Sequence, residues 1–418
     1  MKKTLRIILI VLIAAALGLG ALYFYYDSRE VRTFATEDIV FNGTDIREYE
    51  QRWTHPVLKF FMKELVLKPE KERVNELGIL RSLPLELELP DDAQSTYEVL
   101  YAGKSIAKGE GSEYKNFEYK ENGPYEIRVV LHYDATENTD SADIYYSLQF
   151  GLQIDPTIEY SATDCLQGNI LVIKYTKGLD DDRPEVETAL GEAIFIPQGD
   201  GQWIAYVPVG FAQTPGKYNV TVTSGRFSET KTVTVSKREY EEQHMTISSS
   251  TVASTTGADA NADYNEKIPP TFEIFDGEKY WTKAFIQPVN GRITTQFGLY
   301  RYTNGSKTAV RHAGIDIAAE LGTPVPASND GRVVFAGEVI RTGNSVVIEH
   351  GGGLKTYYYH LDSISVKPGD MVKQGDIIGK VGTTGYSTGP HLHFEVRLGA
   401  YPLSPWELID GTSDVYKY

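Results

Sequence analysis

The first apolar pattern in the chain is an unbroken run without charge from Ile7 to Tyr26. About 20 apolar residues are enough to span a bilayer as a helix. A cleaved signal peptide is the competing interpretation, but its apolar core is usually shorter and ends at a small-residue cleavage site, whereas this run ends in four aromatic residues. We therefore predict a transmembrane signal anchor over residues 1–26. Because two lysines and an arginine precede the apolar run, the positive-inside rule places the N-terminus in the cytoplasm and the chain from about Asp27 onward outside the cytoplasm.

The next segment, residues 27–82, mixes short strand-like and helix-like pieces, and we expect a juxtamembrane region of mixed structure. Within it, Val57–Leu67 carries apolar residues at spacings that favour an amphipathic helix. From Leu83 the period changes to two, because Leu85, Leu87 and Leu89 alternate with glutamates. The segment therefore ends where a strand-rich region begins.

Strand-like runs separated by Gly, Asn and Asp turns continue through residues 83–155 and restart over 156–236. Strands at this spacing, without helical patterns between them, are typical of β-sandwiches. The segment Pro215–Val222 resembles the late strands of bacterial immunoglobulin-like modules. The runs expected to form strands are 97–101, 125–133, 144–154, 170–175, 193–196, 203–207, 218–224 and 230–235.

Composition then changes at residues 245–266, which are rich in Ser, Thr, Ala and Asp and short of apolar side chains. Such a segment cannot build a core, so we expect an extended linker over 237–282. A new strand-rich unit covers 283–410, and 411–418 is read as a tail. The predicted fold class is mainly β, with a single N-terminal helix in the membrane.

Charge and cysteine usage exclude some classes of function. The formal net charge of −16 argues against nucleic-acid binding, which selects for basic surfaces. It also means that bulk charge does not attract the protein to an anionic cell-wall polymer, so wall binding must come from a shaped site. Cys165 is the only cysteine in the sequence, so no intrachain disulfide can form, and we read it as a buried small apolar residue.

Candidate chemistry lies in the C-terminal unit, where histidines recur in strand-like segments. His312 and Asp316 share one face of a strand, because Gly314 between them disfavours a helix. His391 and His393 project to one side of a second strand, with apolar residues behind them. Two imidazoles held in parallel on a rigid strand suit a metal ion and a neighbouring acid/base group.

At these residues the chain strongly resembles the LytM/lysostaphin family of metallopeptidases, from about Phe285 to Asp410. The resemblance rests on the His-x-x-x-Asp and His-x-His motifs, on Tyr-x-His-Leu at His360, and on the glycine turns around them. It implies an all-β peptidase domain with one zinc ion held by His312, Asp316 and His393. It implies that His360 and His391 are catalytic without being ligands, and that the substrate is peptidoglycan.

Three neighbouring signals receive other interpretations. Asn304 lies in a stretch that is similar to one in relatives, where a substrate contact is possible and an ordering role in the loop competes with it. His350 is read as structural. The two Gly-Asp turns of Val366–Asp376 resemble part of a lipoyl or biotinyl carrier domain, but the modified lysine and its motif are missing, and the peptidase accounts for the same turns.

Two other functions compete with hydrolysis. Some LytM-like domains act as scaffolds or activators of other wall hydrolases, but these have usually lost ligands or catalytic histidines, and all five positions are filled here. A wall-binding module with a structural zinc would need four protein ligands, and only three are in evidence. The expected function is therefore a membrane-anchored zinc metallo-endopeptidase that cuts peptide bonds in peptidoglycan cross-links or stem peptides.

Overall fold

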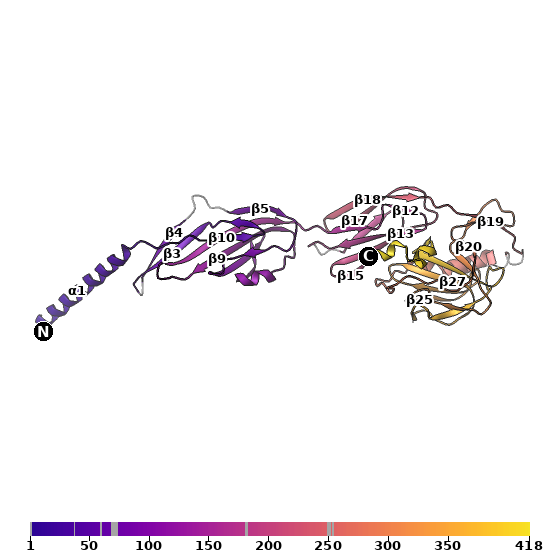
Figure 1. Cartoon of the computed structure of the whole chain (residues 1–418). Coiled ribbons are helices and arrows are strands. Elements are labelled where there is room, and N and C mark those ends of the chain that lie inside the picture. Colours follow the sequence, from indigo (N-terminus) through magenta and orange to yellow (C-terminus); the bar gives the residue numbers. More distant parts are fainter. Residues whose placement is uncertain are drawn as a thin grey trace. The chain divides into compact units, whose positions relative to one another are not determined.

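The computed structural model describes residues 2–36, 38–58, 61–67, 74–179, 183–248, 252 and 255–418 (Figure 1). The chain divides into two compact units, residues 1–155 and 156–418. Among the described residues, strands dominate both units, which confirms the predicted mainly β fold class.

The N-terminal apolar run forms helix α1 (Lys2–Asp27). An 18-residue window within Lys2–Tyr25 has a mean hydropathy of 2.7, and none of that window is buried inside the protein. A helix this apolar leaves its side chains exposed only when something other than the protein solvates them, which suits a membrane span or a signal sequence.

The rest of the first unit is built from two antiparallel-rich sheets. One has the strand order β4-β3-β10-β9-β7-β8, with β5 parallel to β10, and the other has the order β2-β1-β6. Alternate residues of β9 and β10 are buried, as a one-sided core requires. The strands are β1 (Ile39–Phe41), β2 (Thr44–Ile46), β3 (Glu50–Leu58), β4 (Phe61–Leu67), β5 (Asn75–Leu80), β6 (Leu87–Glu88), β7 (Gln94–Tyr101), β8 (Lys104–Glu110), β9 (Gly123–Tyr133) and β10 (Ser141–Leu152).

The helix predicted over Val57–Leu67 is wrong. Residues 57–58 end β3, and 61–67 form β4, which pairs with β3 in antiparallel register from Gln51↔Leu67 onward. Residues 59 and 60 lie outside the described part of the chain. Nor do residues 27–82 stand apart from 83–155, because β3 and β5 both pair with β10. Cross-strand pairing, a long-range effect, overrides the local helical spacing here.

The second unit begins with two facing sheets, ordered β11-β13-β16-β15 and β12-β18-β17-β14. Cys165 is buried in the core between them, as expected. The predicted strands at 170–175, 203–207, 218–224 and 230–235 all fall in this pair of sheets. The strands are β11 (Thr157–Tyr160), β12 (Asp164–Leu166), β13 (Asn169–Thr176), β14 (Glu185–Thr188), β15 (Phe195–Gly199), β16 (Gln202–Val209), β17 (Gly216–Ser224) and β18 (Phe227–Ser236).

Strand β13 is buried on both faces. Leu171 and Ile173 belong to the core between the two sheets, while Ile170 and Val172 belong to the core of the C-terminal sheet system. Burying a side chain of this size is worth roughly 1.5–3 kcal/mol. The second sandwich and the C-terminal domain are therefore joined by a shared apolar core.

The C-terminal domain is built on a sheet of order β20-β23-β30-β27-β26-β25-β28, with β24, β29 and β31 paired off this path. Its core is made of alternating apolar residues of the central strands. The elements are β20 (Arg292–Thr295), β21 (Tyr300–Thr303), β22 (Val310–Arg311), β23 (Ile315–Ala318), β24 (Pro324–Pro326), β25 (Gly331–Val339), β26 (Gly343–Glu349), β27 (Leu354–Ile364), β28 (Met371–Val372), β29 (Ile377–Val381), β30 (His391–Leu398), β31 (Tyr401–Leu403), α4 (Pro405–Ile409) and η3 (Asp414–Tyr416).

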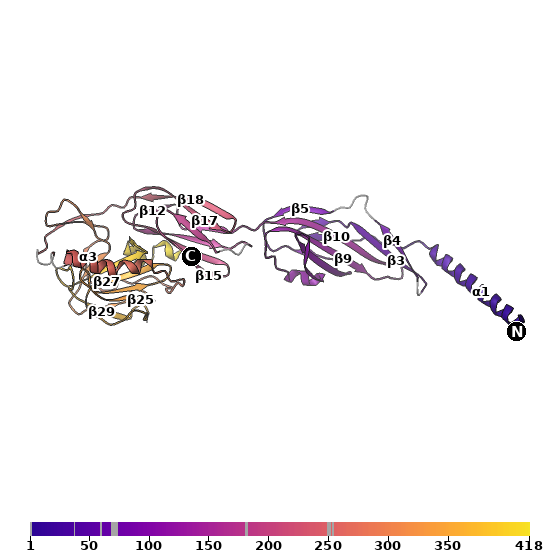
Figure 2. The same ribbon diagram turned by 180° about the vertical axis from the view of Figure 1, so that it is seen from behind.

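The extended linker predicted over 237–282 is wrong where the structure describes it; residues 249–251, 253 and 254 lie outside the described residues. Strand β19 (Glu242–Met245) pairs in parallel with β21, and helix α3 (Ala258–Lys267) lies against the end of β25 (Figure 2). Trp281 is 1% exposed. Backbone pairing and a few buried apolar residues order this polar segment against β21 and the end of β25.

Candidate metal centre and active-site cleft

Two neighbouring strands position the candidate metal centre. Strands β23 and β30 pair in antiparallel register, which sets Asp316 directly opposite His393. A Cβ on Gly314 would lie 2.2 Å from the carbonyl oxygen of Phe394, so only glycine lets the chain approach β30 this closely. His312 precedes that glycine, and its amide donates to the carbonyl of Leu299 at 2.9 Å.

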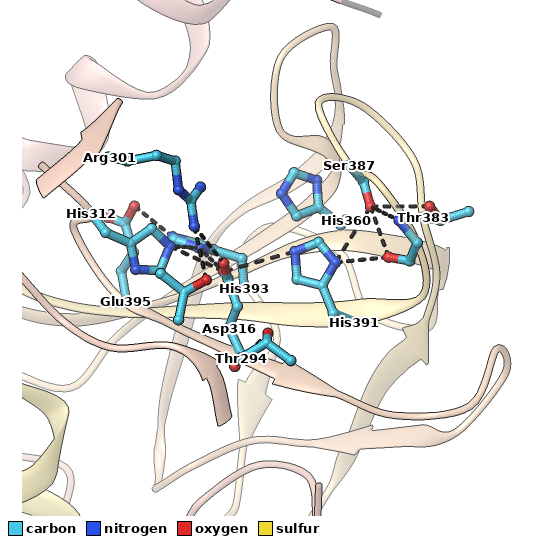
Figure 3. A network of polar contacts seen from close by, with 12 residues as sticks. Thr294, Arg301, His312, Asp316, His360, Thr383, Ser387, His391, His393 and Glu395 are labelled. Carbon is cyan, nitrogen blue, oxygen red and sulfur yellow. Dashed lines mark hydrogen bonds and ion pairs between the residues drawn. The ribbon is translucent and has the colours of Figure 1, made fainter. Parts of the chain in front are cut away.

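The side chains of His312, Asp316 and His393 converge on one point (Figure 3). His312 Nε2 lies 3.0 Å and His393 Nδ1 lies 2.8 Å from Asp316 Oδ1. The two ring nitrogens are 3.0 Å apart. All three residues are less than a tenth exposed. They form a group of the size and composition that can hold a metal ion.

Hydrogen bonds on the outer side of each ring fix which nitrogen faces the centre. His312 Nδ1 donates to the carbonyl of Gln296 at 3.2 Å, and His393 Nε2 donates to Glu395 Oε1 at 2.9 Å. Glu395 is in turn bound by Arg397 Nε at 2.6 Å. In the neutral imidazole the inner nitrogen therefore carries a lone pair. When both rings are neutral, two lone pairs and a carboxylate oxygen face one another, which is the arrangement that a cation fits.

The pKa shifts of Asp316 and His393 also favour a cation at this point. Burial raises the pKa of Asp316, but His312 and His393 outweigh it and hold that pKa well below its usual value. Burial lowers the pKa of His393, but its bonds to Asp316 and Glu395 raise that pKa to about 9. A cation at this point would therefore take the place of a proton on His393. Arg301 Nη2 holds the other oxygen of Asp316 at 3.1 Å.

His360 and His391 lie beside this centre and face it with their Nε2 atoms. The Nδ1 atom of His360 donates to the carbonyl of Thr384, and that of His391 donates to the carbonyl of Gly389, each at 2.8 Å. Their ring centroids are 4.9 Å apart, and His391 Nε2 is 3.7 Å from Asp316 Oδ1. Burial and the neighbouring histidines lower the pKa of His360 to about 3. Its Nε2 is therefore unprotonated at neutral pH.

The backbone at His360 is unusual for a strand residue. Its φ is 62°, a left-handed conformation that costs free energy for any residue other than glycine. The register between β26 and β27 shifts here, and the amide of His360 donates to the carbonyl of Thr342 at 2.8 Å. The irregularity turns the ring out of the sheet and toward His391.

The five residues open into a cleft of about 550 Å³. One wall carries Gln243, Met245 and Ile247 from β19 and the residues after it, and another carries Tyr264 from α3 together with Arg341. Both walls thus include residues that the sequence placed in a linker. The cleft gives a peptide-sized ligand access to the candidate metal centre.

Comparison with known proteins agrees with this geometry. Residues 310–405 match the model of peptidase family M23, a stretch that contains all five of these residues. This stretch is a peptidase M23 domain. The expected resemblance to LytM and lysostaphin is thereby confirmed for the C-terminal part of the chain.

Several relatives of this M23 domain carry the names of bacterial endopeptidases. The chain is 47% identical over 121 residues to the DD-carboxypeptidase/endopeptidase Mpg of Neisseria meningitidis serogroup B, covering 29% of this chain and 28% of Mpg. It is 39% identical over 126 residues to the peptidoglycan DD-endopeptidase ShyB of Vibrio cholerae, covering 30% of each. The chain therefore spans less than a third of the length of these relatives.

Among solved structures, the catalytic domain of lysostaphin from Staphylococcus simulans is 36% identical. The match covers 29% of this chain and 93% of that domain, with a TM-score of 0.27 over the whole chain. The remainder of the chain, with its sandwiches and α1, lies outside this match.

Asn304 follows β21 and is not among the residues that line the M23 cleft, but it bonds to Ile247, which is. Its side-chain oxygen accepts from the amide of Ile247 at 2.9 Å, and its side-chain nitrogen donates to the carbonyl of the same residue at 3.1 Å. Asn304 adopts φ 53°, a conformation that asparagine tolerates. Asn304 therefore orders the wall, and a direct substrate contact stays a prediction.

Arg301 and Glu395 were not predicted as site residues from the sequence. For Glu395 a signal existed, because it continues the alternation of His391 and His393 and so shares their face of β30. For Arg301 no signal existed, since it reaches Asp316 from β21, a separate sheet.

Proposed function

We propose that the M23 domain is a zinc metallo-endopeptidase that hydrolyses peptide bonds in peptidoglycan cross-links or stem peptides. One zinc ion would be held by His312, Asp316 and His393. The observation that carries the proposal is the convergence of two imidazoles and a carboxylate beside two further histidines whose Nδ1 atoms donate to main-chain carbonyls. The peptidoglycan endopeptidase names of the relatives support the substrate class.

When bound, the zinc ion would supply Lewis acidity, which makes water nucleophilic near neutral pH. The side chains of the domain supply the remaining chemistry. An Nε2 atom of His360 or His391 accepts the proton of the attacking water and later donates it to the leaving amine. The other histidine donates to the developing oxyanion once it carries a proton. Glu395 and Arg301 orient the ligand set through their bonds to His393 and Asp316.

The test compares metal content and hydrolysis on the same samples of the full-length chain in detergent. We expect about one zinc per chain and release of cross-linked muropeptides from purified peptidoglycan, both measured by mass spectrometry. His132→Ala is the matched control, because His132 pairs with Asp143 in the first unit and is far from the domain in sequence. A protein that is fully loaded with zinc and inert on several wall chemotypes would support the scaffold function instead.

We further propose that α1 anchors the protein in the membrane, with the N-terminus in the cytoplasm and both units on the outer side. The support is the apolar run from Ile7 to Tyr26 and the basic residues before it. The chain should then resist extraction at alkaline pH and be released by detergent. A mature N-terminus at or after Asp27 would show that α1 is removed as a signal sequence.

A further inference from the structure

Two of the four arginines that line the M23 cleft, Arg311 and Arg341, have no acidic partner among the described residues. The charged residues that line the cleft are Arg301, Arg311, Arg341, Arg397, Asp316 and Glu395. Arg301 is bound to Asp316 and Arg397 to Glu395, so these charges are compensated. Arg311 donates to main-chain carbonyls and is enclosed by the rings of Phe211, Tyr240 and Tyr300.

Arg341 differs from the other three arginines. The only side-chain acceptor found for it in the described part of the chain is the neutral amide oxygen of Asn261 on α3. Its guanidinium lies 5.2 Å from the ring centroid of Tyr264, also on α3. A guanidinium has five N–H donors, so several remain for a ligand in the cleft.

The backbone of Arg341 is fixed relative to the proposed catalytic machinery. Its carbonyl accepts from the amide of Tyr386 at 2.8 Å, and the carbonyl of the next residue, Thr342, accepts from the amide of His360 at 2.8 Å. The cation and the histidine are thus held by adjacent peptide units of one turn between β25 and β26. A ligand that bound Arg341 would be aligned with respect to His360.

We infer that Arg341 is a specificity-determining residue that binds a free carboxylate of the substrate peptide. The inference rests on the proposed peptidase function. Planar guanidinium and carboxylate groups match in a bidentate geometry, and an amide in place of the carboxylate loses the charge. In a chain of net charge −16, an uncompensated cation in the cleft is the feature that can attract an anionic group locally. The domain should therefore distinguish peptides with a free carboxylate from the same peptides carrying a carboxamide.

The experiment uses synthetic cross-linked muropeptides that differ only by amidation of one carboxylate at a time. For one of these positions, the wild-type full-length chain should show kcat/KM roughly 10- to 100-fold higher for the carboxylate, the range expected of a charge-assisted hydrogen bond. Arg341→Gln should bring this ratio close to one, and Arg341→Lys should keep part of it. Arg292→Gln, at an exposed arginine at the start of β20, should keep the wild-type ratio.

Binding of the same peptides to zinc-loaded His360→Ala, with and without Arg341→Gln, provides a readout that does not depend on hydrolysis. A carboxylate preference that vanishes with Arg341 supports the inference even if the wild type cleaves nothing, in which case the peptidase proposal alone fails. A preference that persists in Arg341→Gln overturns the inference. So does the absence of any carboxylate preference in the wild type, or an equal loss with both peptide forms.

Discussion

Two buried polar clusters in the M23 domain have similar compositions and different architectures. The metal centre unites two histidines with Asp316, and the second cluster unites His350 with Glu349 and Lys355, all three fully buried. In the second cluster every charge meets its complement within the protein. Lys355 Nζ lies 2.9 Å from Glu349 Oε2, and Glu349 Oε1 accepts from the amides of Gly351 and Gly353 at 3.2 and 2.9 Å.

The difference is in the balance of donors and acceptors. His350 donates from Nδ1 to the carbonyl of Asp330 and bonds Thr356 through Nε2, so neither nitrogen faces a cavity. At the metal centre three acceptor atoms face one another at the base of a cleft. Burial of ionisable groups is common to both clusters, and the surplus of lone pairs at the candidate metal centre supports the proposal that it binds a cation.

The largest effect is expected from the metal centre. His312→Ala or Asp316→Asn removes one of three proposed ligands, so bound zinc should fall to a small fraction and hydrolysis should drop by about 1,000-fold or more. Elemental analysis and muropeptide release measure the two quantities. Thermal unfolding should confirm that the variants fold. Full zinc occupancy in both would contradict the ligand assignment.

The closed cluster should respond in stability and not in metal content. Glu349→Gln leaves the ammonium of Lys355 buried without its partner, which should lower the free energy of unfolding by about 3–5 kcal/mol. Denaturant titration measures this change. The double variant Glu349→Gln/Lys355→Met removes both charges and should recover much of the loss. Zinc per folded chain should equal that of the wild type. A loss of zinc would contradict the claim that this cluster serves stability and not metal binding.

The histidines beside the centre should separate chemistry from metal binding. His360→Ala or His391→Ala removes a proton carrier or an oxyanion partner, so the rate should fall on the order of 100-fold while zinc is retained. Single-turnover hydrolysis with parallel metal analysis tests this. Wild-type activity in either variant would show that its histidine is not catalytic, and zinc loss in both would make them ligands.

The smallest effect concerns acid stability. Burial lowers the pKa of His350 to about 4, below its unfolded value near 6.5, so the folded state favours the neutral ring. The stability that depends on this ring is complete above pH 6.5 and is lost as the pH falls toward 4, by about 2 kcal/mol between pH 7 and 5. His350→Phe should flatten this part of the pH profile, measured by denaturant titration. An unchanged profile would mean that other groups govern it.

The parts of the site that follow strand period could be predicted from the sequence. His391 and His393 share a face of β30 because alternate residues do. The same rule predicted one strand face for His312 and Asp316, but His312 lies before β23 and reaches Asp316 from the preceding loop, at 3.0 Å. The walls of the cleft could not be predicted, since Met245 and Tyr264 lie in a polar segment whose order depends on pairing with β21 and on contacts with β25. The hairpin of β3 and β4 escaped prediction for the same reason, as its pairing partners are set by the tertiary fold.

Strand β19 and helix α3 also bear on how this domain can be exchanged between proteins. A transplant that begins at residue 283 carries all five histidine and aspartate side chains of the site, together with Arg301. It leaves behind the strand paired with β21 and the helix that holds Arg341. We expect such a chimaera to keep the proposed chemistry and to lose the proposed selectivity. The segment that determines substrate choice would then begin earlier in the chain than the segment that carries the proposed catalytic residues.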